Sequence, residues 1–498
     1  MKPNYQSVNT FGELCKASGQ SIVECRLQAA EIVKIVLCEP YVSLEKAACD
    51  NGEVRYNGKL IVSFLYEDVS GKLCRAERGA EFYHKAENPL IAQAHTAVGG
   101  LTVQNVKIRR EGGQLIASCV IEGAFTVFGQ RRYSYVCGGE DLQVKKETVP
   151  FFSAYTATVS VEEEDEFDCD FAQDILLHGE SIAITDTRCS IGEVDVKGEL
   201  CLQFCMLRAD GSLCSYERLT PIRAQVLLDS VSPDSSIKTE GRILWTHVSA
   251  STDEEKGKSK IVVSYRVEFI VTAFEKTEMD VAVDAYSTTV ETELKYEETH
   301  TMYALNMENI TERVHGSVVF GDRPSEENGL IAVVFPKAFA SVQKTGGGAE
   351  VQGAIEAKAL YRASSGSVET VDVTLPFIFP VEIEGDVDLA EVDCSVYGFG
   401  MRVRSGGETE AEATLKLRIT PYSRSCCRYL CEVVEGEKKE EKTCAVSVYV
   451  PAENDCLWTT AKRLSLTPEK LMEANPTLAF PLKGEERIII YRQKQEKL

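Results

Sequence analysis

Cysteine is the residue type with the most capacity for chemistry in this sequence, because the chain has 18 cysteines and only six histidines. Cys201 and Cys205 lie in the alternating run "LCLQFCML". Four residues of strand span about 13 Å, too far for one zinc ion. Cys426, Cys427 and Cys431 are closer together, but no histidine or CxxC pair accompanies them in the sequence. We therefore expect no metal site, and cysteines that serve as small apolar side chains.

Sequence motifs of known catalytic loops are missing. The chain has no GxxxxGK[ST], no HExxH and no GxSxG, and its histidines are scattered without ligand spacing. The glycine-rich "TGGGAE" at 345–350 joins two strand-like runs, which indicates a loop rather than a phosphate-binding turn. We expect no catalytic residue, no cofactor and no enzymatic activity.

The charge balance limits the kinds of partner. The net charge is −23, from 77 acidic and 54 basic residues, which opposes binding to nucleic acid because phosphate contacts need clustered Lys and Arg. The first twenty residues contain no apolar stretch of signal-peptide length, and no apolar run of 18 residues occurs. We expect a cytoplasmic chain with no membrane insertion.

An internal repeat of domain size is the strongest pattern upstream of residue 440. Three segments, beginning at Tyr56, Val196 and Val351, each contain a glycine, an alternating run and a second glycine thirteen residues after the first. The glycine pairs are Gly58 and Gly71, Gly198 and Gly211, and Gly353 and Gly366. The second glycine stands in a turn dipeptide, so each segment predicts a β-hairpin with one buried face.

These hairpins and the alternating runs at 114–129, 260–275 and 410–422 predict a mainly β fold. We expect three tandem antiparallel β-domains, each sandwich- or barrel-like. Acidic or polar stretches at 161–168 and 293–316 divide them. The expected bounds are 1–160 with an N-terminal extension, 161–310 and 311–433, followed by a charged linker at 434–443.

The last segment, 444–498, changes to a helical period. "VSVYV" at 446–450 predicts a strand, and Asp455 is a good N-cap for a helix that contains Leu457 and Trp458. Thr467 and Pro468 predict the start of a second helix, and "RIIIYR" at 487–492 predicts a closing strand. The order is that of a small α+β (βααβ) module with a two-stranded antiparallel sheet. Trp458 at this spacing is more often a core residue than a binding platform.

This segment resembles a LysM domain. The matching positions are Asp455, Leu457, Trp458, Ala461, Lys462, Leu466, Leu471, Asn475, Gly484, Ile488 and Ile490. Asn454 and Cys456 replace the usual glycine and threonine, and asparagine tolerates the left-handed backbone of such a turn. The resemblance implies a groove between the loops 453–457 and 475–482. The expected groove residues are Asn454, Asp455, Cys456, Leu457, Asn475, Pro476 and Leu478.

The three upstream repeats resemble SPOCS domains, with Pro221 and Pro376 closing the second and third hairpins. Three such repeats before one LysM domain resemble the SipL-type spore morphogenetic proteins. The resemblance implies a scaffold in the mother-cell cytoplasm, at the forespore surface or spore coat, whose LysM domain binds a coat-assembly ATPase. The alternative is a LysM domain that binds peptidoglycan or another N-acetylglucosamine-containing glycan of the cortex or cell wall.

Overall fold

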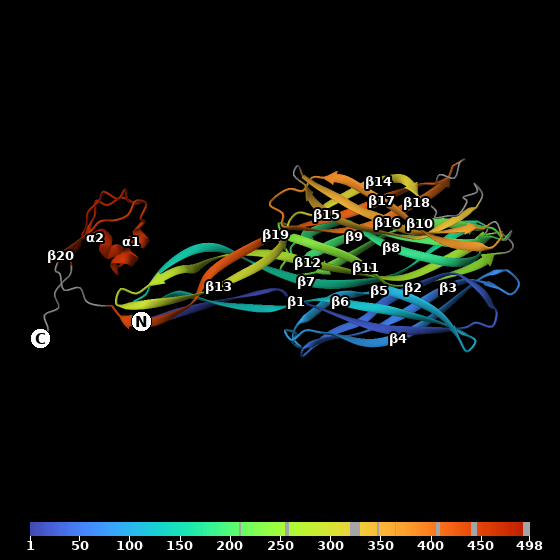
Figure 1. The fold of residues 1–498 in the computed structure, drawn as a ribbon, viewed down its shortest axis with the longest axis horizontal. Coiled ribbons are helices and arrows are strands. Elements are labelled where there is room, and N and C mark those ends of the chain that lie inside the picture. Colours follow the sequence, from blue (N-terminus) through green and yellow to red (C-terminus); the bar gives the residue numbers. More distant parts are fainter. Residues whose placement is uncertain are drawn as a thin grey trace.

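The computed structural model describes residues 1–170, 172–208, 211–253, 258–318, 329–345, 348–363, 365–404, 409–439 and 446–491. These residues form a mainly β structure of small antiparallel sheets with two short helices (Figure 1), so the mainly β part of the expected fold class is confirmed. Neither described helix has the length and apolarity that a membrane crossing requires.

In the part of the chain that the structure describes, nineteen strands precede the C-terminal segment, in three successive sets. The first set is β1 (Lys2–Gln28), β2 (Ile32–Asp50), β3 (Glu53–Asp68), β4 (Leu73–Glu87), β5 (Thr96–Glu111) and β6 (Gln114–Glu140). The second is β7 (Gln143–Asp170), β8 (Ala172–Ser190), β9 (Glu193–Arg208), β10 (Leu213–Leu227), β11 (Ser236–Asp253) and β12 (Lys258–Tyr286). The third is β13 (Val290–Ala304), β14 (Glu308–Val318), β15 (Leu330–Thr345), β16 (Gly348–Arg362), β17 (Val368–Val381), β18 (Leu389–Val403) and β19 (Thr409–Lys438).

Each set has the same topology. In the first two sets the sixth strand lies between the first and the fifth, which gives the sheets β1-β6-β5 and β7-β12-β11. The second, third and fourth strands form the other sheet of each set, β2-β3-β4 and β8-β9-β10. In the third set β19 pairs with β18 on one side. On its other side β13 pairs with the later half of β19 and β14 with the earlier half, so these two strands replace one long first strand. The sheet β15-β16-β17 completes the repeat.

The predicted hairpins are confirmed, and they share one register. The first glycine of each pair lies opposite an apolar residue at the equivalent position: Gly58 opposite Phe82, Gly198 opposite Ile222, and Gly353 opposite Phe377. The turn glycines have positive φ, +79° at Gly71, +76° at Gly211 and +85° at Gly366. Only glycine adopts this conformation without a steric penalty, which explains why each turn has one.

Alternation along the strands determines the cores. In β12 the residues Ile261, Val263, Tyr265, Val267, Phe269 and Val271 are all buried, as their period of two predicts. They share one hydrophobic cluster with β9 residues such as Leu200 and Phe204 from the other sheet of the set. The first and third sets have equivalent clusters that also combine residues from their two sheets.

The long strands stay paired beyond the body and form a stalk, which Figure 1 shows between the body and the C-terminal segment. Val136, Leu142, Ala282, Leu430 and Val433 form one of its apolar clusters, so strands from all three sets share a core there. A second cluster, which includes Tyr135, Phe151 and Tyr429, lies further along these strands. The chain passes from set to set through the turns at 141–142 and 287–289.

Three of the expected divisions lie inside strands. The acidic stretch 161–168 is part of β7 and pairs with β12 along its whole length. Its charges lie along the exposed part of a strand, where Lys260 pairs with Glu166 at 2.6 Å, while Phe167 is buried. The expected division after residue 310 falls within β14. Residues 434–438 of the expected linker belong to β19, and 440–443 lie outside the described residues.

The C-terminal segment has the predicted order of elements. It contains β20 (Val446–Tyr449), α1 (Leu457–Leu464), α2 (Pro468–Ala474) and β21 (Ile488–Tyr491). β20 and β21 pair antiparallel. The helices supply Ala461, Leu464 and Leu471 to a small core with Leu482 and with Ile488 and Ile490 of β21. We call residues 446–491 the C-terminal module.

Candidate functional site

The N-cap of the first helix in the C-terminal module lies one residue after the N-cap that the sequence predicts. Its N-cap is Cys456: the Cys456 sulfur accepts the Thr459 N–H at 3.5 Å, and the Thr459 hydroxyl accepts the Cys456 N–H at 3.0 Å. The Thr459 hydroxyl also lowers the pKa of the exposed Cys456 thiol. The prediction of Asp455 as N-cap is therefore wrong. Its carboxylate accepts the Ala452 N–H at 3.0 Å and pairs with Arg463 at 2.8 Å, so it closes the preceding turn.

The two loops expected to form a groove lie side by side. The N–H of Asn454 donates to the carbonyl of Leu482 at 2.8 Å, and the N–H of Leu482 donates to the carbonyl of Asp455 at 3.0 Å. Asn454 has φ of +68°, the left-handed conformation that asparagine tolerates. Because main-chain bonds join loops 453–457 and 475–482, their relative position is fixed.

Asn475 is a structural residue of this pair of loops. Its side chain is buried, its Oδ1 accepts the Ile489 N–H at 2.8 Å, and its Nδ2 donates to the Ile489 carbonyl at 2.8 Å. A further bond reaches the carbonyl of Leu471 at 3.1 Å. The amide thus joins the end of α2 to β21 and has little capacity left for an external ligand.

The other expected groove residues differ in exposure. Asn454, Cys456 and Pro476 are exposed, whereas Leu457 and Leu478 are half-buried against the core of the module. An external ligand at the loops would therefore meet mainly the first three of these side chains.

Trp458 connects the C-terminal module to the stalk. Its indole N–H donates to the Asp284 carboxylate at 2.7 Å, and Lys462 pairs with the other oxygen of the same carboxylate. The Tyr286 ring meets the Trp458 ring edge-on at 5.0 Å, and the Tyr286 hydroxyl donates to the carbonyl of Leu466 at 2.7 Å. Burial raises the pKa of Tyr286. Trp458 therefore makes an interface with β12 in addition to packing against the module's core.

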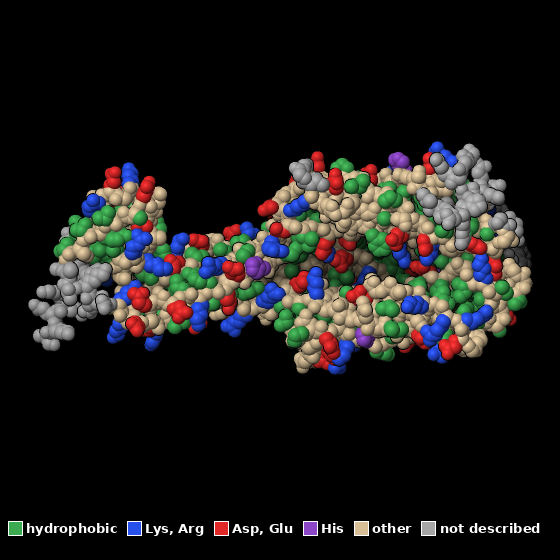
Figure 2. Space-filling view, in the orientation of Figure 1, with side chains coloured by type: hydrophobic (Ala, Val, Ile, Leu, Met, Phe, Trp, Pro, Cys, Tyr) green, Lys and Arg blue, Asp and Glu red, His purple; other side chains and the backbone are tan. Residues whose placement is uncertain are grey.

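An apolar surface lies on the outer face of β20 and β21, and sequence reasoning did not find it. Val446, Val448, Val450 and Ile489 are 53, 60, 53 and 36 % exposed. Figure 2 shows hydrophobic side chains gathered on this part of the C-terminal module. We call these four residues the valine face. Both helices cover only the opposite face of the two-stranded sheet, so an alternating strand there exposes its valines.

A cavity between the repeats contains charged side chains that pair with neighbours of opposite charge. This cavity, of about 1060 Å³, has Arg75, Glu77, His178 and Glu180 in its lining. Arg75 pairs with Glu77 at 2.5 Å, and the imidazole of His178 lies 3.2 Å from the Glu180 carboxylate. Each of these pairs lies within one strand. The contact between the two repeats is made by Arg75, which donates to the carbonyl of Ile175 at 3.2 Å, and by His178, whose Nε2 lies 3.9 Å from the Glu77 carboxylate.

Comparison with known proteins identifies no relative. No family model, curated protein or solved structure matches this chain. The function is therefore argued from the geometry and from the resemblance of the sequence.

Proposed function

We propose that this chain is a non-enzymatic adaptor of spore-coat assembly, of the SipL type. Its three repeats act as SPOCS-like β-sandwiches that form a platform, and its C-terminal module acts as a LysM domain that binds a coat-assembly ATPase at the forespore surface. The place of action is the mother-cell cytoplasm. The common register of the three hairpins and the element order of the module support this proposal.

The valine face is the observation that carries the proposal. Four aliphatic side chains on a module of this size form an exposed apolar strip, and such strips mark protein interaction sites. An aliphatic strip offers no hydrogen-bond donors or acceptors to sugar hydroxyls, whereas it fits the apolar centre of a protein–protein interface.

A second candidate function is glycan binding, with the two joined loops, which we call the loop pair, as the binding site. Loops 453–457 and 475–482 are held together by main-chain bonds and expose Asn454 and Pro476. A linear N-acetylglucosamine oligomer would bind along these loops and would leave the valine face unchanged.

Two single substitutions distinguish protein binding through the valine face from glycan binding at the loop pair. Val448→Lys places a charge in the centre of the valine face, and Ala479→Lys places the same charge on an exposed position of the loop pair. Both positions are exposed, so both variants should keep the fold, which circular dichroism checks. Leu457→Lys is less suitable because Leu457 packs against the module's core.

We expect Val448→Lys to weaken binding to the purified ATPase at least thirtyfold, because losing an interface anchor typically costs about 2 kcal/mol. Ala479→Lys should bind the ATPase like the unmodified chain. Undiminished ATPase binding by Val448→Lys would contradict the adaptor reading. Binding of chito-oligosaccharides that Ala479→Lys abolishes would establish the glycan reading instead.

A further inference from the structure

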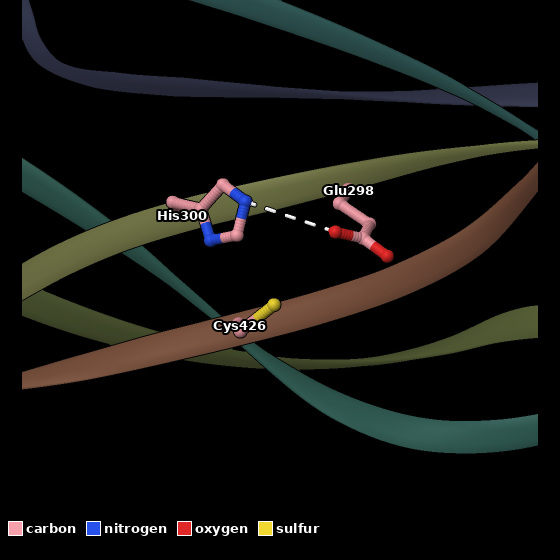
Figure 3. A group of neighbouring side chains, drawn as sticks. All are labelled: Glu298, His300 and Cys426. Atoms are coloured by element: carbon pink, nitrogen blue, oxygen red, sulfur yellow. Dashed lines mark ion pairs between the residues drawn. The ribbon is translucent and has the colours of Figure 1, made fainter.

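A cluster of three different metal-ligating side chains lies on the stalk. The pairing of β13 with β19 puts His300 directly opposite Cys426, and Glu298 lies two residues from His300 on the same face (Figure 3). The potential ligand atoms of Glu298, His300 and Cys426 all lie within 4.8 Å of one another. Partners that are far apart in the sequence thus meet at the surface of one strand pair.

The donor set fits one class of cation. Thiolate, imidazole and carboxylate together are the ligands of Zn²⁺ and similar borderline divalent ions. Ligand atoms around tetrahedral zinc are about 3.3 to 3.8 Å apart, given bond lengths of about 2.0 to 2.3 Å. The three side chains are exposed, so a change of rotamer can bring their ligand atoms that much closer.

His300 and Glu298 make one long ion pair with each other, drawn as a dashed line in Figure 3. His300 Nε2 lies 3.8 Å from the Glu298 carboxylate, which is too long for a hydrogen bond, so a cation between them would replace only this contact. Arg428 is the nearest cation along β19 and lies opposite Glu298, but its guanidinium is centred 4.2 Å over the ring of Tyr296.

We propose that Glu298, His300 and Cys426 form a surface site for a borderline divalent cation such as Zn²⁺, with a fourth position open to water or to a ligand from another molecule. The site is independent of the proposed adaptor function, since it lies on the stalk strands and not on the C-terminal module.

Titration of the tag-free, reduced full-length chain with Co²⁺ tests the proposal, because cobalt replaces zinc and gives a thiolate-to-metal absorption band. We expect one Co²⁺ per chain at a thiolate-containing site, displaced by Zn²⁺. Cys426→Ser should remove the band, and His300→Gln should weaken binding at least tenfold. Cys456→Ser is the matched control, because Cys456 is the other exposed cysteine of the described residues, and it should bind as the unmodified chain does.

Three results would overturn the site. They are a chain that shows no thiolate-to-cobalt band, a Cys426→Ser variant that keeps the band, and a Cys456→Ser variant that loses it. Substitutions at three exposed positions should leave the circular dichroism spectrum unchanged. If His300→Gln binds cobalt as tightly as the unmodified chain, the assigned ligand set is likewise excluded.

Discussion

The side chain of Asn475 makes the hydrogen bonds that a neighbouring β-strand would make. Its amide oxygen and nitrogen bond the N–H and C=O of Ile489, the same pair of main-chain groups that a neighbouring strand would satisfy. Among the described strands β21 pairs with β20 alone, so the amide completes the hydrogen bonding of its other edge at this point. A residue that the LysM resemblance places in a ligand groove thus has its bonding capacity committed within the module.

Asn475→Ala should therefore destabilise the C-terminal module. The substitution removes the buried amide that bonds the N–H and C=O of Ile489, a loss of about 1 to 3 kcal/mol for the two hydrogen bonds. In a Trp245→Phe background Trp458 is the remaining tryptophan of the chain, and its fluorescence during thermal unfolding reports on the module. Pro476→Ala, at the exposed neighbouring position, is the control and should melt like the background. Equal melting of Asn475→Ala and the background would show that the amide is dispensable.

At the scale of the element, the repeated hairpin glycines make room for a neighbouring strand. A Cβ on Gly353 would lie 2.0 Å from the carbonyl oxygen of Phe339, and one on Gly58 would lie 2.5 Å from that of Ser43. A Cβ on Gly198 would meet its nearest atom, the carbonyl oxygen of Ala183, at 3.0 Å. The same position in three copies therefore differs in how closely the preceding strand approaches.

This difference predicts a ranked series of alanine substitutions. Gly353→Ala should be the most destabilising and Gly58→Ala intermediate, with losses of about 1 to 3 kcal/mol that are typical of overpacking. Gly198→Ala should be nearly neutral, because alanine also restores up to about 1 kcal/mol of strand stability relative to glycine. Hydrogen exchange of each hairpin, measured by mass spectrometry, gives the local loss. A reversed order of the three variants would show that backbone approach does not explain the glycines.

Local periodicity predicts the strands, but it does not predict their partners. The buried alternation of Ile261 to Val271 and the turn at Gly71 follow from neighbouring residues alone. The stretch 161–168 has the acidic composition of a linker, yet it is a strand because β12 pairs with it. His300 reaches Cys426 only through the register of β13 and β19, and Val448 is exposed because no element of the described residues packs on that face. Such features depend on contacts between distant residues, which one sequence does not specify.

At the scale of the whole molecule, the stalk separates two surfaces. Its strands come from all three repeats and share a core, so the repeats are joined at one end of the body. The C-terminal module lies at the far end of the stalk (Figure 1), where Asp284 and Tyr286 hold it through Trp458, Lys462 and Leu466. The valine face thus lies far from the platform of repeats, an arrangement that suits an adaptor with two separate binding surfaces.

The contact between the C-terminal module and the stalk depends on Asp284. Asp284→Ala removes the acceptor for both the Trp458 indole and the Lys462 ammonium, and losing these charge-assisted bonds should cost the docked state about 2 to 4 kcal/mol. Asp280→Ala is the matched control, because Asp280 lies on the same strand and bonds Thr148 instead. In the Trp245→Phe background, Asp284→Ala should shift Trp458 emission to the red and broaden the particle dimensions in small-angle scattering. Asp280→Ala should change neither.

If Asp284→Ala leaves both the emission and the scattering unchanged, the ring contact with Tyr286 must hold the module without the carboxylate. Under the proposed adaptor function, a variant that undocks but still folds should keep its affinity for the proposed ATPase partner, because the valine face lies on the module itself, and should lose the fixed spacing between that partner and the repeats.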